Sequence, residues 1–123
     1  MLALAAAWMT NDVNAGNWLY MAKYYMANTY TIANTNGDPL AAWISTTNIF
    51  PDFSLENHGY FHPEYQYVAG EELGDAWLMA RIANTNIAAQ LTPFAEHNVT
   101  NVWNNFQHCV GDSGEMNFPA SED

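Results

Sequence analysis

Side chains that can carry chemistry are concentrated between Pro51 and Tyr67, in the segment PDFSLENHGYFHPEYQY. This segment holds two histidines, several aromatic rings, carboxylates and an asparagine. Polar groups crowded onto a loop beside helices form many enzyme sites. The same groups can instead brace an ordinary crossover between helices by bonding to its backbone. Both interpretations stay open on the composition of the segment alone.

A metal site is one chemistry that the spacing suggests. His58 and His62 are four residues apart with a glutamate outside each of them, and on a helix this spacing is typical of a zinc pair. Gly59 and Pro63 disfavour a continuous helix here, and the sequence offers no obvious third ligand. We therefore predict no metal and no other cofactor.

The elements that would position this segment are helices, because apolar residues recur every three and four positions on both sides of it. Pro63 suits the first position of a helix, where its missing N–H is not needed, and Thr92-Pro93 gives a similar start signal further on. The run 36–39 indicates a turn, residues 40–50 stay open between a helical turn and an extended segment, and 51–62 should form an irregular loop. The expected helices span 2–9, 13 to a point between 28 and 34, 63–86 and 93–109.

A short sequence that occurs twice in the chain suggests an internal repeat. Ile32–Asn36 reads IANTN and recurs as Ile82–Asn86, fifty residues later. An offset of this size matches one antiparallel helix pair with its loops, which is the unit of helical repeat proteins. Chance recurrence in an Asn-rich chain is the alternative.

Composition narrows the classes of partner. The chain has 123 residues, half of them hydrophobic, which suits one packed domain. Lys23 and Arg81 stand against thirteen acids, giving a formal charge of -11. Nucleic acid and anionic membrane surfaces are therefore excluded as partners, since both need Lys and Arg. The remaining polarity comes largely from Asn and Thr, which suits neutral hydrogen-bonding partners such as sugars. With Cys109 as the single cysteine, no internal disulfide is possible.

The central segment resembles polysaccharide lyases of the heparinase II/III and chondroitin/hyaluronan lyase kind. The run D-F-S-L-x-N-H-G from Asp52 to Gly59 is close to a D-G-S-x-x-x-H pattern in those lyases, with Phe53 where the pattern favours glycine. Pro63, followed by Tyr65 or Tyr67, then opens the next helix. The resemblance implies an all-α fold of antiparallel helical hairpins, part of an (α/α) toroid. Residues 1–123 are expected to form a partial toroid domain, incomplete at both ends, that needs the remainder of its own polypeptide and exposes a hydrophobic side.

The same resemblance implies β-elimination on a polysaccharide that contains uronate units. His58 would be the base or the group that neutralises the uronate carboxylate, and Tyr65 or Tyr67 would be the general acid or base. Asn57 would donate to the substrate carboxylate, and Trp43 and Tyr60 would stack on sugar faces. The substrate-binding residues that the resemblance implies are Trp43, Glu56, Asn57, Tyr60 and His62. The partner would be a polysaccharide or oligosaccharide, met in an extracellular or periplasmic location.

Two other functions stay open. A glycoside hydrolase of the same helical architecture would use carboxylates, and Glu71, Glu72 and Asp75 form an acidic cluster that is otherwise a solvated helix face. A non-catalytic helical-repeat binding module would turn over nothing. The charge of -11 is unfavourable for a strongly anionic polysaccharide, unless cations outside this chain or a less charged substrate offset it.

Overall fold

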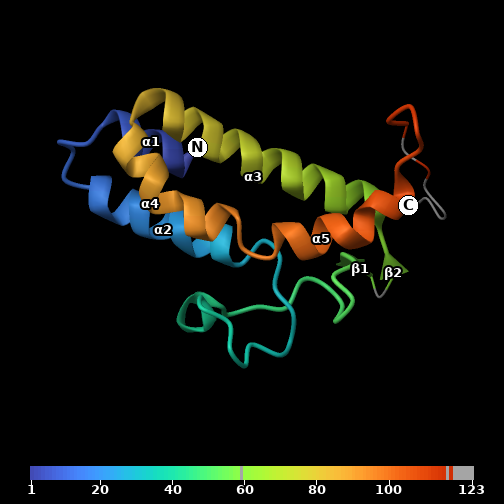
Figure 1. Cartoon of the computed structure of the whole chain (residues 1–123). Helices are drawn as coiled ribbons and strands as arrows, with labels where there is room; N and C mark the ends of the chain where they lie inside the picture. Colours follow the sequence, from blue (N-terminus) through green and yellow to red (C-terminus); the bar gives the residue numbers. More distant parts are fainter. Residues whose placement is uncertain (59, 116, 118–123) are drawn as a thin grey trace.

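The computed structural model describes residues 1–58, 60–115 and 117, with the backbone alone described at 56, 57 and 60. Helices dominate it, so the all-α class is confirmed; the arrangement of hairpins in a toroid stays a prediction (Figure 1). The α-helices are α1 (Leu2–Trp8), α2 (Ala15–Ala27), α3 (Pro63–Ala83), α4 (Thr85–Ala95) and α5 (Val99–Phe106). The remaining elements are two 3-10 turns, η1 (Ala41–Trp43) and η2 (Gln107–Cys109), and two short strands, β1 (Glu56–Asn57) and β2 (Tyr60–Phe61).

Helix α3 is the longest element, and α1, α4 and α5 pack against it (Figure 1). The chain turns back after α3, so that α4 and then α5 run beneath it in the opposite direction, while α1 packs on its C-terminal half and α2 packs on α1 and α4. Small residues such as Ala3, Ala7 and Ala80 are almost fully buried where these helices meet. They let the helix backbones approach closely, and larger apolar side chains such as Leu73 and Leu91 fill the remaining space.

The long connection from α2 to α3 is held against the helices by asparagine side chains. The Asn28 amide donates to the carbonyls of Tyr24 and Trp43, each at 2.8 Å, and its oxygen accepts the Ser45 N–H at 2.8 Å. Asn48 in turn donates to the Asn28 carbonyl. These bonds satisfy backbone groups at the end of α2, so Asn28 and Asn48 brace the loop against that helix.

The predicted helix 93–109 is wrong in its start and its continuity. Thr92 does not cap a helix, because its hydroxyl donates to the Ala88 carbonyl at 3.0 Å and accepts the Trp77 indole N–H at 3.0 Å. Pro93 consequently lies inside α4, and the cap is Asn84, whose side chain accepts the backbone N–H groups of the first helical turn. A left-handed Asn98, with φ of 59°, then separates α4 from α5.

The repeated IANTN sequence corresponds to a local turn and not to a repeated helix pair. The side-chain oxygen of Asn34 accepts the Asn36 N–H at 3.1 Å, and that of Asn84 accepts the Asn86 N–H at the same distance. The first copy nevertheless lies in the loop beyond α2, whereas the second joins α3 to α4. Asparagine favours this side-chain turn in either setting, so sequence identity did not require equivalent positions in the fold.

Helix α3 leaves several apolar side chains exposed; the hydrophobic side expected of a partial toroid stays a prediction. Leu78, Met79 and Ile82 are all exposed, Ile82 to 75%. Trp8 of α1 is also 75% exposed. Among the helices that the structure describes, none combines the length and apolar character that crossing a membrane requires.

Candidate functional site

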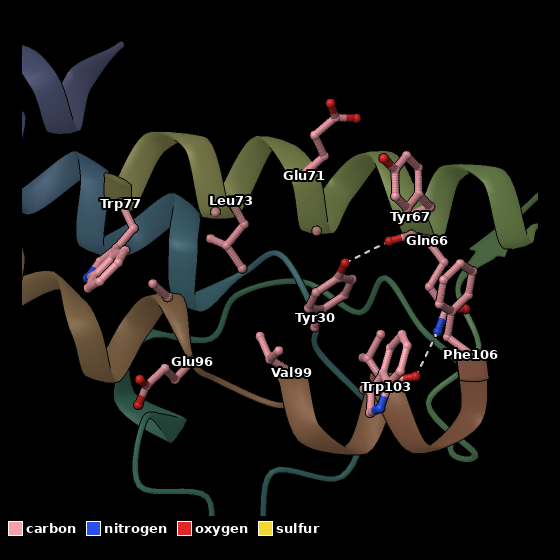
Figure 2. Close-up of a pocket in the computed structure, with 14 residues that line it drawn as sticks. Tyr30, Gln66, Tyr67, Glu71, Leu73, Trp77, Glu96, Val99, Trp103 and Phe106 are labelled. Atoms are coloured by element: carbon pink, nitrogen blue, oxygen red, sulfur yellow. Dashed lines mark hydrogen bonds between the residues drawn. The ribbon is translucent and has the colours of Figure 1, made fainter. Parts of the chain in front are cut away.

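A groove of about 360 Å³ lies between α3 and the α4–α5 arm (Figure 2). Its walls are mainly apolar and aromatic, with Tyr67, Trp77, Trp103 and Phe106 as the rings that project from the helices. The other lining residues are Tyr30, Gln66, Gly70, Glu71, Leu73, Gly74, Ala95, Glu96, Val99 and Val102.

The floor of the groove is Tyr30, which is only 2% exposed. Its hydroxyl donates to the Gln66 carbonyl at 2.7 Å (Figure 2). Burial raises the pKa of Tyr30 to about 12, so the phenol stays protonated and acts as a fixed donor. A side chain at Gly70 would meet this hydroxyl, since a Cβ built there lies 3.0 Å from it. Glycine at 70 therefore allows the phenol to approach α3.

Gln66 joins three segments at one end of the groove. Its amide nitrogen donates to the carbonyls of Phe53 and Val102, at 3.2 and 3.3 Å, and its oxygen accepts the Leu55 N–H at 3.0 Å. The loop 53–55, α3 and α5 are thus tied through one buried amide. Gln66 is not among the site residues predicted from the sequence, although it precedes the buried Leu73 and Ala80 at successive seven-residue intervals. The signal that could have identified it is a polar residue on the same helix face as these buried apolar residues.

The rings of the groove pack on one another at the end where α3 begins. Tyr67 stacks with Phe106 at a centroid distance of 6.5 Å and an interplanar angle of 21°. Trp103 lies 6.3 Å from the same Phe106 ring. Tyr67 and Trp103 remain 49% and 52% exposed, so each offers part of its surface to a ligand.

The predicted irregular loop contains a small hairpin. β1 and β2 pair antiparallel, with Glu56 opposite Phe61 and Asn57 opposite Tyr60, and an isolated bridge joins Ile49 to Leu55. The side chains of Glu56, Asn57 and Tyr60 lie outside the described residues, so their predicted binding roles remain predictions. The hairpin lies at the end of the molecule where α3 begins (Figure 1).

His58 lies at the tip of this hairpin with an exposed side chain. Its φ of 53° is left-handed, a conformation that tight turns need. Phe53, which stands where the lyase pattern favours glycine, also has a positive φ, of 66°. Its neighbour Asp52 accepts the Ser54 hydroxyl at 2.7 Å and the Ser54 N–H at 3.0 Å, and these two bonds hold the pKa of Asp52 below its usual range. Asp52 therefore braces the turn.

His62 and Tyr65 form a stacked pair at the start of α3. Their ring centroids are 4.0 Å apart with an angle of 13° between the planes. The His62 ring is buried, and among the described residues neither of its nitrogens has a hydrogen-bond partner. Tyr65 is 41% exposed but does not line the groove, whereas Tyr67, two residues on, does.

Trp43 lies apart from the other predicted site residues. Its ring packs 5.2 Å from Tyr20 of α2 and 4.9 Å from Phe94 of α4. This packing fixes η1 against the helices. The structure thus brings Tyr67 into the groove, leaves His58 and Tyr65 exposed but outside its lining, and places Trp43 in the helix packing.

His97 and Asp38 form a contact that ties the end of α4 to the segment after α2. His97 is buried, with Nδ1 3.1 Å from the Ala27 carbonyl and Nε2 2.8 Å from an Asp38 carboxylate oxygen. Both partners only accept hydrogen bonds, so both bonds form together only when the ring carries two protons. Burial raises the pKa of Asp38, but the bonds from His97 and the Leu40 N–H and the His97 charge outweigh it and hold this pKa below its usual value.

Among the described residues, no group of three or more His, Cys, Asp and Glu side chains is placed to hold a metal ion. His58 and His62 differ sharply in burial, since one is exposed at the hairpin tip and the other is buried at the start of α3. Comparison with family models, curated proteins and solved structures finds no match for this chain.

Proposed function

We propose that this chain is a carbohydrate-active domain that cleaves a glycan by β-elimination beside a uronate unit. The glycan lies in the groove between α3 and α5, and the segment His58–Tyr67 supplies the proton transfers. The observation that carries the proposal is the position of Tyr67, which belongs to the His/Tyr segment and also forms part of the groove wall. A phenol there contacts whatever the groove holds.

The chemistry requires two proton transfers. His58 takes the proton from the carbon next to the uronate carboxylate, and the electron pair of that C–H bond forms a carbon–carbon double bond as the bond to the 4-linked oxygen breaks. Tyr67 gives its proton to the departing oxygen, and Tyr65 stands two residues away as the alternative acid. His58 is exposed and both phenols are partly exposed, so a substrate can reach all three.

The backbone at Phe53 supports the resemblance on which this chemistry rests. The lyase pattern favours glycine at this position, and glycine is the residue that adopts a positive φ without strain. Phe53 holds a φ of 66° here, followed by the buried Ser54 and the exposed His58 turn. The backbone at Phe53 therefore has the positive φ for which the pattern's glycine is suited.

The electrostatics favour a glycan whose uronates are sparse or balanced. Neither basic side chain lines the groove: the Lys23 ammonium donates to the Gln90 side chain at 3.3 Å, and Arg81 lies over the Trp77 ring on α3. A uniformly anionic chain would be repelled by a net charge of -11. Ring faces in the groove suit the apolar faces of sugars instead.

Replacement of His58 tests the proposal. In β-elimination assays on uronate-containing glycans, His58→Ala should lower the rate of ultraviolet-absorbing unsaturated product by roughly 10²–10⁴, the usual contribution of a proton-transfer group. His108→Ala is the matched control, because His108 is also exposed but lies in η2. Equal activity of the two variants, or unsaturated product at the wild-type rate from His58→Ala, contradicts the proposal.

Glycoside hydrolysis is the second candidate, because Glu71 of α3 and Glu96, the residue that follows α4, both line the groove. It is less favoured, since the Glu71 carboxylate points away from the space between α3 and α5 (Figure 2). A hydrolase would release reducing ends without ultraviolet absorbance and would depend on Glu96 rather than His58.

A further inference from the structure

The outer face of α3 carries a continuous row of exposed side chains. Positions that are alternately four and three residues apart lie on one side of a helix, and in α3 this row lies opposite the buried Gln66, Leu73 and Ala80. The row extends over about five helical turns, or about 27 Å, so a second helix could contact it along its length. The members of this outer row, all exposed, are Glu64, Val68, Glu71, Asp75, Leu78 and Ile82.

The outer row changes in chemistry along the helix. Its first half holds the three carboxylates, and its second half is aliphatic. Leu78 is 46% exposed and Ile82 75%, with Met79 beside them at 48%. The Glu71 carboxylate points away from the space between α3 and α5, on the outer side of the helix (Figure 2). Apolar residues at this spacing on an exposed helix face are typical of a surface that another helix covers.

A second copy of this chain does not match the outer row. Two α3 helices running in the same direction would place carboxylates against carboxylates. In opposite directions, the acidic half of each helix would face Leu78 and Ile82 of the other and bury carboxylates without partners. Contact between the two apolar ends alone would involve a few residues on each side, against roughly 20–30 in a standard interface. The charge of -11 on each copy adds repulsion.

The basic side chains of this chain are engaged away from the acidic half of the outer row. The Arg81 guanidinium lies 5.2 Å from the centre of the Trp77 ring, and the Lys23 ammonium on α2 donates to the Gln90 side chain at 3.3 Å. The sequence holds no other Lys or Arg. Positive charge opposite the carboxylates of the row therefore has to come from another molecule, and that molecule also has to cover an aliphatic surface.

We propose that the outer row of α3 docks an amphipathic helix of a partner protein. This helix presents Lys or Arg opposite the acidic half of the row and aliphatic side chains opposite the apolar half. Burial of Leu78 and Ile82 stabilises the complex, and the charge pairs fix the direction and register of the partner. Of the outer row, only Glu71 also borders the groove, so this interaction goes beyond the proposed function and does not depend on it.

Helical peptides of matched composition test the inference on the full chain. The segregated peptide, about three heptads long on an alanine-rich background, carries Lys on one half of a face and Leu on the other half. The mixed peptide carries the same residues on that face in alternation, and a third peptide has Glu in place of Lys.

Calorimetric titration near 0.15 M salt, where long-range attraction is screened, compares the three peptides. The segregated peptide should bind about tenfold more tightly than the mixed one, because it alone matches both halves of the row at once. The Glu peptide should bind more weakly than either. Equal affinity for the segregated and mixed peptides, or tight binding of the Glu peptide, overturns the inference.

Two pairs of variants locate the binding surface. Ile82→Ser should weaken binding of the segregated peptide about tenfold through lost apolar burial, whereas Val13→Ser, at a residue that is 95% exposed before α2, should leave it unchanged. Asp75→Lys should weaken binding to a similar degree, while Asp112→Lys, at an exposed residue of the C-terminal loop, should not. Equal effects within either pair overturn the assignment to the outer row.

Sedimentation of the protein alone tests the competing occupant. The inference predicts a monomer at the concentrations at which the segregated peptide binds. A dimer that Ile82→Ser dissociates would show that a second copy covers the outer row, and this result would overturn the inference. Binding of the protein to neutral lipid vesicles that Ile82→Ser abolishes would assign the row to a membrane surface and overturn it equally.

Discussion

At the scale of single residues, Gln66 shows how one polar side chain defines the end of the groove. Its three side-chain bonds reach the backbone of Phe53, Leu55 and Val102, and the Tyr30 hydroxyl binds its carbonyl. The buried amide thus provides hydrogen-bond partners for backbone groups of the loop and of α5 that are shielded from water. The hairpin that carries His58 follows directly from this tied loop.

Gln66→Leu should destabilise the protein by about 3 kcal/mol, because it leaves one backbone N–H and two carbonyls without their side-chain partner at similar side-chain volume. Chemical denaturation monitored by tryptophan fluorescence measures the change. Gln90→Leu is the control, since Gln90 is exposed and makes one bond of 3.3 Å to Lys23. Its effect should stay within about 0.5 kcal/mol. Similar losses for both variants would show that the buried bonds of Gln66 contribute little.

At the scale of elements, α3 is continuous through two glycines that have different surroundings. Gly70 faces the Tyr30 hydroxyl, whereas a Cβ at Gly74 would meet nothing within 4 Å. Both lie within the helix Pro63–Ala83, where glycine is a poor helix former. Gly70 allows close contact with Tyr30 at the floor of the groove, whereas Gly74 leaves open space within the groove.

Gly74→Ala should stabilise the protein by about 0.5–1 kcal/mol, the usual difference in helix propensity between these residues. Gly70→Ala should give less or none of this gain, because its methyl group would press on the Tyr30 hydroxyl and weaken the bond to the Gln66 carbonyl. The free energies of unfolding of the two variants test this comparison directly. An equal gain at both positions would mean that the Tyr30 ring moves without loss.

At the scale of the whole molecule, His97 and Asp38 connect parts that are distant in the sequence. His97 follows α4, Asp38 lies in the turn after α2, and Ala27 ends α2. Asn98, beside His97, donates to the Tyr30 carbonyl at 2.8 Å. The link between α4 and α5 is therefore fixed to the end of α2, and this fixes the direction in which α5 continues along α3.

The stability that Asp38 contributes should depend on pH. Its folded pKa lies below the usual value of about 3.9, so the contribution is present above that value and is lost as pH falls through the folded pKa. Asp38→Asn should cost about 1 kcal/mol near neutral pH, and the difference from wild type should shrink below about pH 4. Denaturation curves across this range, with the exposed Asp75→Asn as control, measure it. A difference that is constant with pH would contradict the lowered pKa of Asp38.

Several features were predictable because they depend on neighbours along the chain. Pro63 at the first helical position and apolar spacing beyond it placed α3, and the 40–50 segment does hold a helical turn, Ala41–Trp43. The start of α4 was missed because Thr92-Pro93 matched a cap pattern while the Thr92 hydroxyl is used by Trp77, fifteen residues earlier. A capping pattern in the sequence does not show whether the side chain bonds instead to a residue of another helix.

The sequence by itself determined the helical class, the acidic surface and the cluster of histidines and tyrosines around the start of α3, since each follows from residue type and short-range spacing. The tertiary structure alone decided that Tyr67 joins a groove with Trp103 and Phe106, that Trp43 packs between α2 and α4, and that Gln66 is buried. The physical reason is separation along the chain: Gln66 is 36 residues from both Tyr30 and Val102, its partners. Periodicity identifies which face of a helix is apolar, but only packing selects the segment that covers it.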